Sequence, residues 1–124
     1  VLQILLAEDN AVNQKFAITI LERMGHRVTG TNNGKEAVQL WKQGSFDLIL
    51  MDIQMPLLDG RAATAAIRKA EDGTGRHIPI IALTAHALQE EKLQLLSSGF
   101  DGYVPKPMEV SVLTSEIDKV LRQP

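Results

Sequence analysis

The sequence has no cysteine and no long apolar run. Without cysteine, the chain can form neither a disulfide framework nor a thiolate metal site. A helix that crosses a bilayer needs about 20 consecutive apolar residues, and the N-terminus lacks the charged, apolar and small-residue order of a signal peptide. These absences predict a cytoplasmic location, which agrees with a reducing compartment.

The sequence also lacks a strong excess of charge of either sign. Its 13 lysine and arginine residues face 15 aspartate and glutamate residues, so the formal net charge is -2. A nucleic-acid-binding or anionic-membrane-binding face usually produces a clear basic excess. We therefore expect no direct contact of this chain with nucleic acid or with a membrane.

The length and composition predict one domain. The chain has 124 residues, of which 44% are hydrophobic, which is enough for one ordinary core and leaves no room for a second. The first residue is Val1 instead of methionine, and a strand-like run begins at Leu2. We therefore expect residues 1–124 to be a single domain excised from a longer polypeptide.

Five short apolar runs alternate with helix-like segments, which is typical of a parallel sheet covered by helices on both faces. The predicted strands are residues 2–7, 27–31, 47–51, 78–83 and 102–104. The first, third and fourth are continuously apolar, as central parallel strands are. Short right-handed connections favour the flavodoxin-like, doubly wound (βα)₅ fold with strand order 2-1-3-4-5. In that fold the ligand site lies beyond the carboxyl ends of strands 1 and 3.

The helices are predicted from apolar spacing. We expect helices over residues 13–24, 35–42, 60–69 and 110–121, with Asn13 as the N-cap of the first and Gly25 ending it. A further helix between the last two strands has the weakest stripe, made of Leu88, Leu95 and Leu96. The other expected packing faces are formed by Phe16, Ile20 and Met24, by Ala62, Ala66 and Ala70, and by Val110, Leu113, Ile117, Val120 and Leu121.

Five reactive side chains stand at strand ends. Glu8 and Asp9 follow the first strand, Asp52 ends the third, Thr84 ends the fourth and Lys106 follows the fifth. Because the strands are expected to be parallel, these side chains converge at one rim. Three carboxylates at close range repel and raise one another's pKa unless a divalent cation and a lysine compensate.

The expected cation is Mg²⁺, or Mn²⁺ in its place. Mg²⁺ uses few carboxylates, keeps several waters and accepts phosphate oxygens. The absence of cysteine and the scatter of His26, His77 and His86 argue against zinc.

Four motifs carry a family resemblance. They are LLAEDN at residues 5–10, MDIQMPLLDG at 51–60, ALTA at 82–85 and GYVPKP at 102–107. With these motifs in this order, the sequence resembles the response-regulator receiver family over essentially its whole length. Residues 9–14 and 82–87 look more like the receivers of hybrid sensor histidine kinases than like those of stand-alone transcription factors.

The resemblance implies a role for each site residue. Asp52 would accept a phosphoryl group from a phosphohistidine, and Thr84 and Lys106 would hold the phosphoryl oxygens. Asp9, Asp52 and the backbone carbonyl of Gln54 would bind the metal, with Glu8 acting through a metal-bound water. Such a domain is mainly a signalling module, although it catalyses its own phosphorylation and dephosphorylation.

Further expectations concern the signal and its partners. Thr84 and Tyr103 would form a conformational switch, although Tyr103 could equally be ordinary strand packing. A cis peptide bond before Pro107 would aim Lys106 inward. The implied partner is a histidine kinase or a histidine phosphotransfer domain, and the parent chain could itself be a membrane-tethered kinase. A homodimer would use the surface of the fourth helix, fifth strand and fifth helix.

Three other functions are compatible with a fold of this class. A flavin or nucleotide binder is disfavoured because the turn after the first strand, at residues 8–11, is acidic and has no glycine. An aspartyl-phosphate phosphatase is disfavoured because the residue two after Asp52 is Gln54, which is no acid or base. A phosphorylation-independent interaction module that docks partners through the fourth helix, fifth strand and fifth helix remains the alternative.

Overall fold

The computed structural model describes residues 2–53, 55, 58–84, 89–106 and 108–122, and for residues 89–92 it describes the backbone alone. In this part of the chain, strands and helices alternate strictly. The strands are β1 (Gln3–Ala7), β2 (Arg27–Thr31), β3 (Leu48–Asp52), β4 (Ile80–Thr84) and β5 (Gly102–Pro105). The helices are α1 (Ala11–Arg23), α2 (Gly34–Gln43), α3 (Gly60–Glu71), α4 (Gln89–Ser97) and α5 (Val110–Arg122).

The strands form one parallel sheet in the order β2-β1-β3-β4-β5. The predicted fold class and strand order are therefore confirmed, and so are the two edge strands. Every residue of β3 and β4 is buried, whereas most of β2 is exposed or half-buried. A strand buried on both faces has no polar face, which is why β1, β3 and β4 read as continuous apolar runs.

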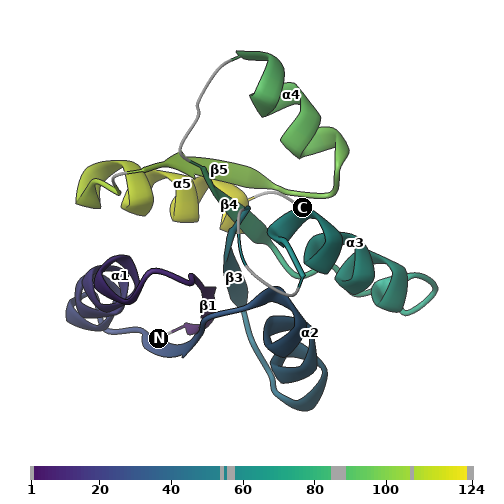
Figure 1. Ribbon diagram of the computed structural model, residues 1–124, viewed down its shortest axis with the longest axis horizontal. Helices are drawn as coiled ribbons and strands as arrows, with labels where there is room; N and C mark the ends of the chain where they lie inside the picture. The colour runs from purple at the N-terminus through teal and green to yellow at the C-terminus, as the bar shows by residue number, and fades with distance from the viewer. Residues whose placement is uncertain (1, 54, 56–57, 85–88, 107, 123–124) are drawn as a thin grey trace.

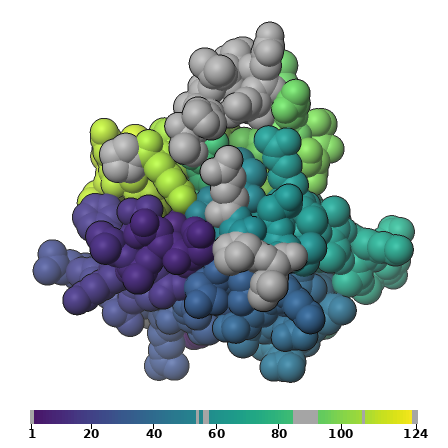
Figure 2. Space-filling model, viewed as in Figure 1, coloured from purple at the N-terminus to yellow at the C-terminus, as the bar shows by residue number. Residues whose placement is uncertain are grey.

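Helices cover both faces of the sheet. α1 and α5 lie on one face, and α2, α3 and α4 lie on the other (Figure 1). Side chains alternate along β1, so Ile4 and Leu6 join the first layer and Leu5 joins the second. The space-filling view places the purple N-terminal part of the chain beside the yellow C-terminal helix, with the teal α3 on the opposite side (Figure 2).

The first helix differs from its prediction. α1 begins at Ala11, and its N-cap is Asn10 instead of Asn13, because the side-chain oxygen of Asn10 accepts the Asn13 N–H at 3.0 Å. Phe16 is 48% exposed, while Ala17 is fully buried. The predicted row of every fourth residue drifts about 40° per step around a helix, which carries its first member off the sheet-facing side. Gly25 ends α1 with a φ of 93°, as expected.

The buried faces of α3 and α5 also differ from their predictions. Of the expected stripe, Ala66 packs half-buried against the core, but Ala62 and Ala70 are exposed, and the buried apolar residues of α3 are Ala63 and Ile67. Burying the branched Ile67 side chain removes more apolar area from water than burying another alanine does. In the fifth helix the buried residues are Leu113, Ile117 and Val120, whereas Val110 and Leu121 of the predicted stripe are exposed.

The fourth helix buries only part of its predicted apolar stripe. Leu95 is buried and Leu96 is 47% exposed, while Leu88 lies outside the described residues. No helix in the described residues has both the length and the apolar character needed to cross a membrane.

The amino end of the sheet carries a closed network of charges. The Arg68 guanidinium lies 2.7 Å from Glu71 and 2.6 Å from Asp101, and it also donates to the carbonyl oxygens of Ile78 and Gly99. The carboxylates in turn accept backbone N–H groups, from Ile78 to Glu71 and from Ile80 to Asp101. These charges are therefore paired within the fold.

The position of α3 makes a first prediction. Ala63→Leu should lower the free energy of unfolding by about 1–3 kcal/mol, because it forces three extra carbons into a filled core. Ala62→Leu, one residue earlier on the exposed side, should change it by no more than about 0.5 kcal/mol. Urea unfolding of both variants measures this difference, and equal losses would mean that α3 packs through another face.

Candidate functional site

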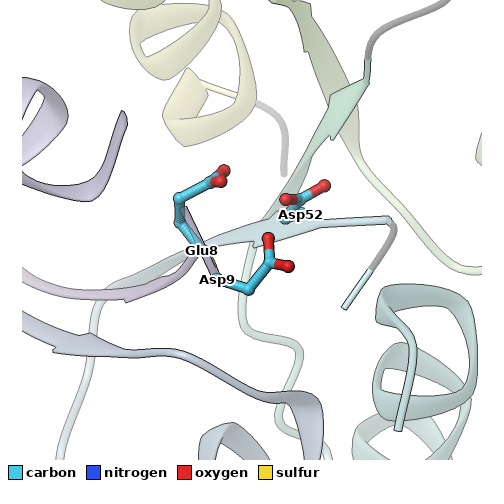
Figure 3. A group of neighbouring side chains, drawn as sticks. All are labelled: Glu8, Asp9 and Asp52. Carbon is cyan, nitrogen blue, oxygen red and sulfur yellow. The ribbon is translucent and has the colours of Figure 1, made fainter. Parts of the chain in front are cut away.

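Three acidic side chains meet at the carboxyl edge of the sheet. Glu8 and Asp9 directly follow β1, and Asp52 is the last residue of β3. Because Ala7 pairs with Met51 across these neighbouring strands, Glu8 stands level with Asp52. One carboxylate oxygen from each residue lies within 4.8 Å of the others, and Asp9 and Asp52 turn toward one another (Figure 3). The predicted convergence of the three acids is therefore found in the fold.

The cluster is buried on one side and open on the other. Glu8 is 1% exposed and Asp52 is 3% exposed, whereas Asp9 is exposed. The Glu8 carboxylate also accepts the backbone N–H of Asn10 at 3.1 Å. Solvent and a small ligand can therefore approach the site from the Asp9 side.

Lys106 is the basic residue that forms ion pairs with the acidic cluster. Its Nζ lies 2.7 Å from Oδ2 of Asp52 and 2.9 Å from Oε2 of Glu8. Lys106 follows β5 and reaches past the end of β4, and its backbone N–H donates to the Thr84 carbonyl at 2.7 Å. Pro105 lacks a donor but pairs in register with Thr84 on the edge strand, where a proline is tolerated.

The charges perturb one another. Burial raises the pKa of the Glu8 carboxyl above its usual value, the Lys106 ammonium lowers it in part, and the Asp52 carboxylate adds to the rise. Burial works to lower the pKa of Lys106, but its contacts with Asp52 and Glu8 outweigh burial and raise that pKa overall. One ammonium thus contacts two carboxylates in a cluster of three, and the site attracts further positive charge.

Thr84 lies on β4, next to the strand of Asp52, and Tyr103 lies on β5, the strand that Lys106 follows. Thr84 is the last residue of β4 and is 4% exposed, one position beyond the Leu83 that pairs with Asp52. Tyr103 pairs with Ala82 and packs, half-buried, against the second apolar layer. The packing expectation for Tyr103 therefore holds in this conformation. Gln54 and Pro107, also predicted for the site, lie outside the described residues.

Sequence reasoning missed the part that Gly60 plays. Gly60 is the first residue of α3, and a Cβ there would collide with the carbonyl oxygen of Asp52. Its N–H donates to the Ile53 carbonyl at 2.8 Å, and Asp59 caps the helix through Ala62 N–H. The absence of a side chain at Gly60 therefore lets α3 begin directly against the backbone of Asp52. The available signal was a glycine where a helix starts, next to a capping aspartate.

The fold and the site together define a class. This is a doubly wound α/β protein with a cation-attracting acidic site at the carboxyl edge of the sheet, where the strand order reverses. The response regulator receiver domain family matches residues 4–118, and the chain belongs to that family.

Known proteins extend this assignment. The chain is 45% identical over 121 residues to hybrid signal transduction histidine kinase I of Dictyostelium discoideum, across 94% of this chain and 7% of that protein. It spans between 7% and 13% of the length of this relative and of two further curated relatives that it matches. The predicted likeness to the receivers of hybrid sensor histidine kinases is confirmed.

Solved structures of receiver domains are also similar to this chain, and two of them bear on its site and its partners. The receiver domain of sensor histidine kinase PA1611 from Pseudomonas aeruginosa PAO1, with magnesium coordinated in its active-site cleft, is 39% identical with a TM-score of 0.86, over 98% of each chain. The receiver domain of Ssk1 from Saccharomyces cerevisiae, in complex with the histidine phosphotransfer protein Ypd1, is 36% identical. Its TM-score is 0.83, over 91% of this chain and 83% of that one.

The raised pKa of Glu8 makes a second prediction. Between the usual glutamate pKa and the raised value, the folded chain binds more protons than the unfolded chain, so its stability falls as pH rises. Without metal, Glu8→Gln should therefore be more stable than the parent at neutral pH. The advantage should shrink as pH falls from the raised value toward the usual glutamate pKa. Below the usual pKa it should vanish, because the Glu8 side chain is then neutral, like glutamine, in both the folded and the unfolded chain.

Urea unfolding in EDTA, from acidic to neutral pH, measures this effect. Glu22→Gln, on the exposed side of α1, is the matched control. It keeps Glu8, so its stability should follow that of the parent chain at every pH. A loss of stability in Glu8→Gln at neutral pH would mean that the ion pair with Lys106 outweighs burial.

Proposed function

We propose that this receiver domain accepts a phosphoryl group on Asp52 from a phosphohistidine, in a Mg²⁺-dependent step of a phosphorelay. The observation that carries the proposal is the environment of Asp52. Its carboxylate lies 2.7 Å from the Lys106 ammonium and shares the carboxyl edge of the sheet with Glu8 and Asp9. A nucleophile, a fixed cation and acidic metal ligands are thereby grouped at one point.

The donor set suits a small, hard cation. All three side chains offer carboxylate oxygens, within 4.8 Å of one another, and ligands on opposite sides of Mg²⁺ are about 4 Å apart. We propose that Asp9, Asp52 and the carbonyl of Gln54 bind Mg²⁺, or Mn²⁺, with Glu8 acting through a bound water. The magnesium in the PA1611 receiver supports this choice. When bound, the ion would supply positive charge to the oxygens of the transferred group.

The chain's own residues provide the rest of the chemistry. A carboxylate oxygen of Asp52 attacks phosphorus, the bond from phosphorus to the histidine nitrogen breaks, and an acyl phosphate forms. Asp52 needs no general base, because an ionised carboxylate has no proton to lose. The raised pKa of Lys106 keeps its ammonium charged, and with the Thr84 hydroxyl it would hold the phosphoryl oxygens.

The donor we propose is a histidine kinase or a histidine phosphotransfer domain. The complex of the Ssk1 receiver with Ypd1 supports a partner of this kind. We also propose that residues 1–124 act as one cytoplasmic module. A homodimer through α4, β5 and α5 stays a prediction, and analytical ultracentrifugation tests it.

The third prediction concerns the acceptor. Asp52→Asn should abolish phosphoryl uptake, because an amide nitrogen or oxygen is a poor nucleophile toward phosphorus. Intact-mass measurement after exposure to a phosphohistidine donor should find one added phosphoryl group on the parent chain and none on the variant. Asp72→Asn, an exposed change at the end of α3, should behave like the parent, and a phosphorylated Asp52→Asn chain would move the acceptor elsewhere.

A second measurement separates this proposal from a phosphorylation-independent interaction module. Beryllofluoride mimics the phosphoryl group of an acyl phosphate. The parent chain should bind it only with Mg²⁺ present, and the Asp52→Asn chain should not. A parent chain that ignores beryllofluoride would favour the interaction module.

The fourth prediction concerns the signal. An acyl phosphate adds close to two negative charges beside Thr84 and Lys106, and each hydrogen bond to it supplies about 1.5–3 kcal/mol. A shift of Thr84 toward the phosphoryl group would leave space for Tyr103, and the surface of α4, β5 and α5 would change. Hydrogen exchange with beryllofluoride should differ from exchange without it in residues 84–106. Equal protection there would place the signal at the rim of the site itself.

A further inference from the structure

Gln14 joins the ends of two strands beside the acidic cluster. It lies in the first turn of α1, and its side-chain Nε2 donates to the backbone carbonyl oxygens of Thr31, at 2.9 Å, and Glu8, at 3.2 Å. Thr31 is the last residue of β2, and Glu8 is the first residue after β1. One side chain thus ties α1 to both strands at the carboxyl edge of the sheet.

The bond to the Glu8 carbonyl acts on Asp9. That carbonyl belongs to the peptide unit that joins Glu8 to Asp9, and a peptide unit is planar and rigid. The N–H of Glu8 is already held by the Thr31 carbonyl at 3.0 Å. Gln14 holds the carbonyl group of Glu8. The Gln14 carboxamide therefore sets the direction in which the chain leaves Glu8 toward Asp9.

Gly30 provides the room for this contact. A Cβ at Gly30 would lie 3.1 Å from Cδ of Gln14 and 3.3 Å from its Nε2, which is tighter than ordinary van der Waals contact. The N–H of Gln14 donates to the carbonyl of Asn10, the residue that caps α1. The capped turn and the glycine on β2 together place the carboxamide over the strand ends.

We infer that Gln14 is a positioning residue for the metal site. It holds the Glu8–Asp9 peptide so that the Asp9 carboxylate faces Asp52 (Figure 3), and it thereby sets the affinity of the site for a divalent cation. The inference rests on the proposed function, since a cation must bind there for this orientation to matter. Loss of an outer partner of a metal site typically costs 10–100-fold in affinity.

The fifth prediction is that Gln14→Met binds Mg²⁺ roughly tenfold more weakly than the parent chain, at the lower end of that range. Methionine keeps the length and the aliphatic contacts of glutamine but has no donor. Gln43→Met, at the exposed end of α2, is the matched control and should keep the parent affinity. Calorimetric titration with Mg²⁺ gives the affinities, and thermal unfolding of the metal-free chains gives their stability.

A second pair of variants tests the same contact from β2. Gly30→Ala pushes against the Gln14 side chain and should weaken Mg²⁺ binding in the parent background. In Gln14→Ala the obstructing carboxamide is gone, so adding Gly30→Ala should change the affinity little further. In the NMR spectra of metal-free chains, the Asp9 amide resonance should shift in Gln14→Met and stay in place in Gln43→Met.

The outcomes separate the two proposals. If the parent chain binds no Mg²⁺, the proposed function fails and the inference about Gln14 fails with it. If the parent binds Mg²⁺ and Gln14→Met binds equally well with a lower unfolding temperature, Gln14 is merely structural and only the inference is overturned. If Gln14→Met does not fold, a folded Gly30→Ala chain with the parent's Mg²⁺ affinity overturns it.

Discussion

The structure depends on an imbalance of charge at one edge of its sheet. One ammonium, on Lys106, contacts the carboxylates of Glu8 and Asp52, and the Asp9 carboxylate lies within 4.8 Å of both acids. At the opposite edge, Arg68 forms ion pairs with Glu71 and Asp101, and these two carboxylates also accept backbone N–H groups. Like charges held at close range cost free energy. This cost falls at the edge of the sheet where the proposed cation would bind and offset the repulsion.

Such a cluster needs a rigid support. Glu8 and Asp9 follow β1 and Asp52 ends β3, and each of these central strands is held by a neighbouring strand on both sides. Gly60 lets α3 begin against the Asp52 backbone, and Gly34 lets α2 begin against the carbonyl of Leu58, in the loop between β3 and α3. Gln14 holds α1 against the ends of β1 and β2, because its carboxamide donates to the carbonyls of Glu8 and Thr31. Contacts to backbone carbonyl groups therefore help to hold the acids in place.

Much of this could be predicted from local pattern. Continuous apolar runs mark strands buried on both faces, and polar residues directly after them mark the edge of the sheet. Strand order then follows from short right-handed connections. For these reasons the positions of Glu8, Asp9, Asp52, Thr84 and Lys106 could be predicted as one group. Gln14 and Gly60 stood inside recognised motifs, but their spacing carries no sign of the carbonyl groups that they contact.

The sequence by itself determined the fold class, the strand order and the identity of the clustered acids, because these depend on apolar periodicity and on which residues follow each strand. The tertiary structure decided which helix faces are buried, as with Ala17 instead of Phe16 and Ala63 instead of Ala62. It also decided that Lys106 contacts two of the acids and that Gln14 bridges two strands. These choices depend on contacts between residues far apart in the chain, where several arrangements satisfy the local pattern and packing selects one.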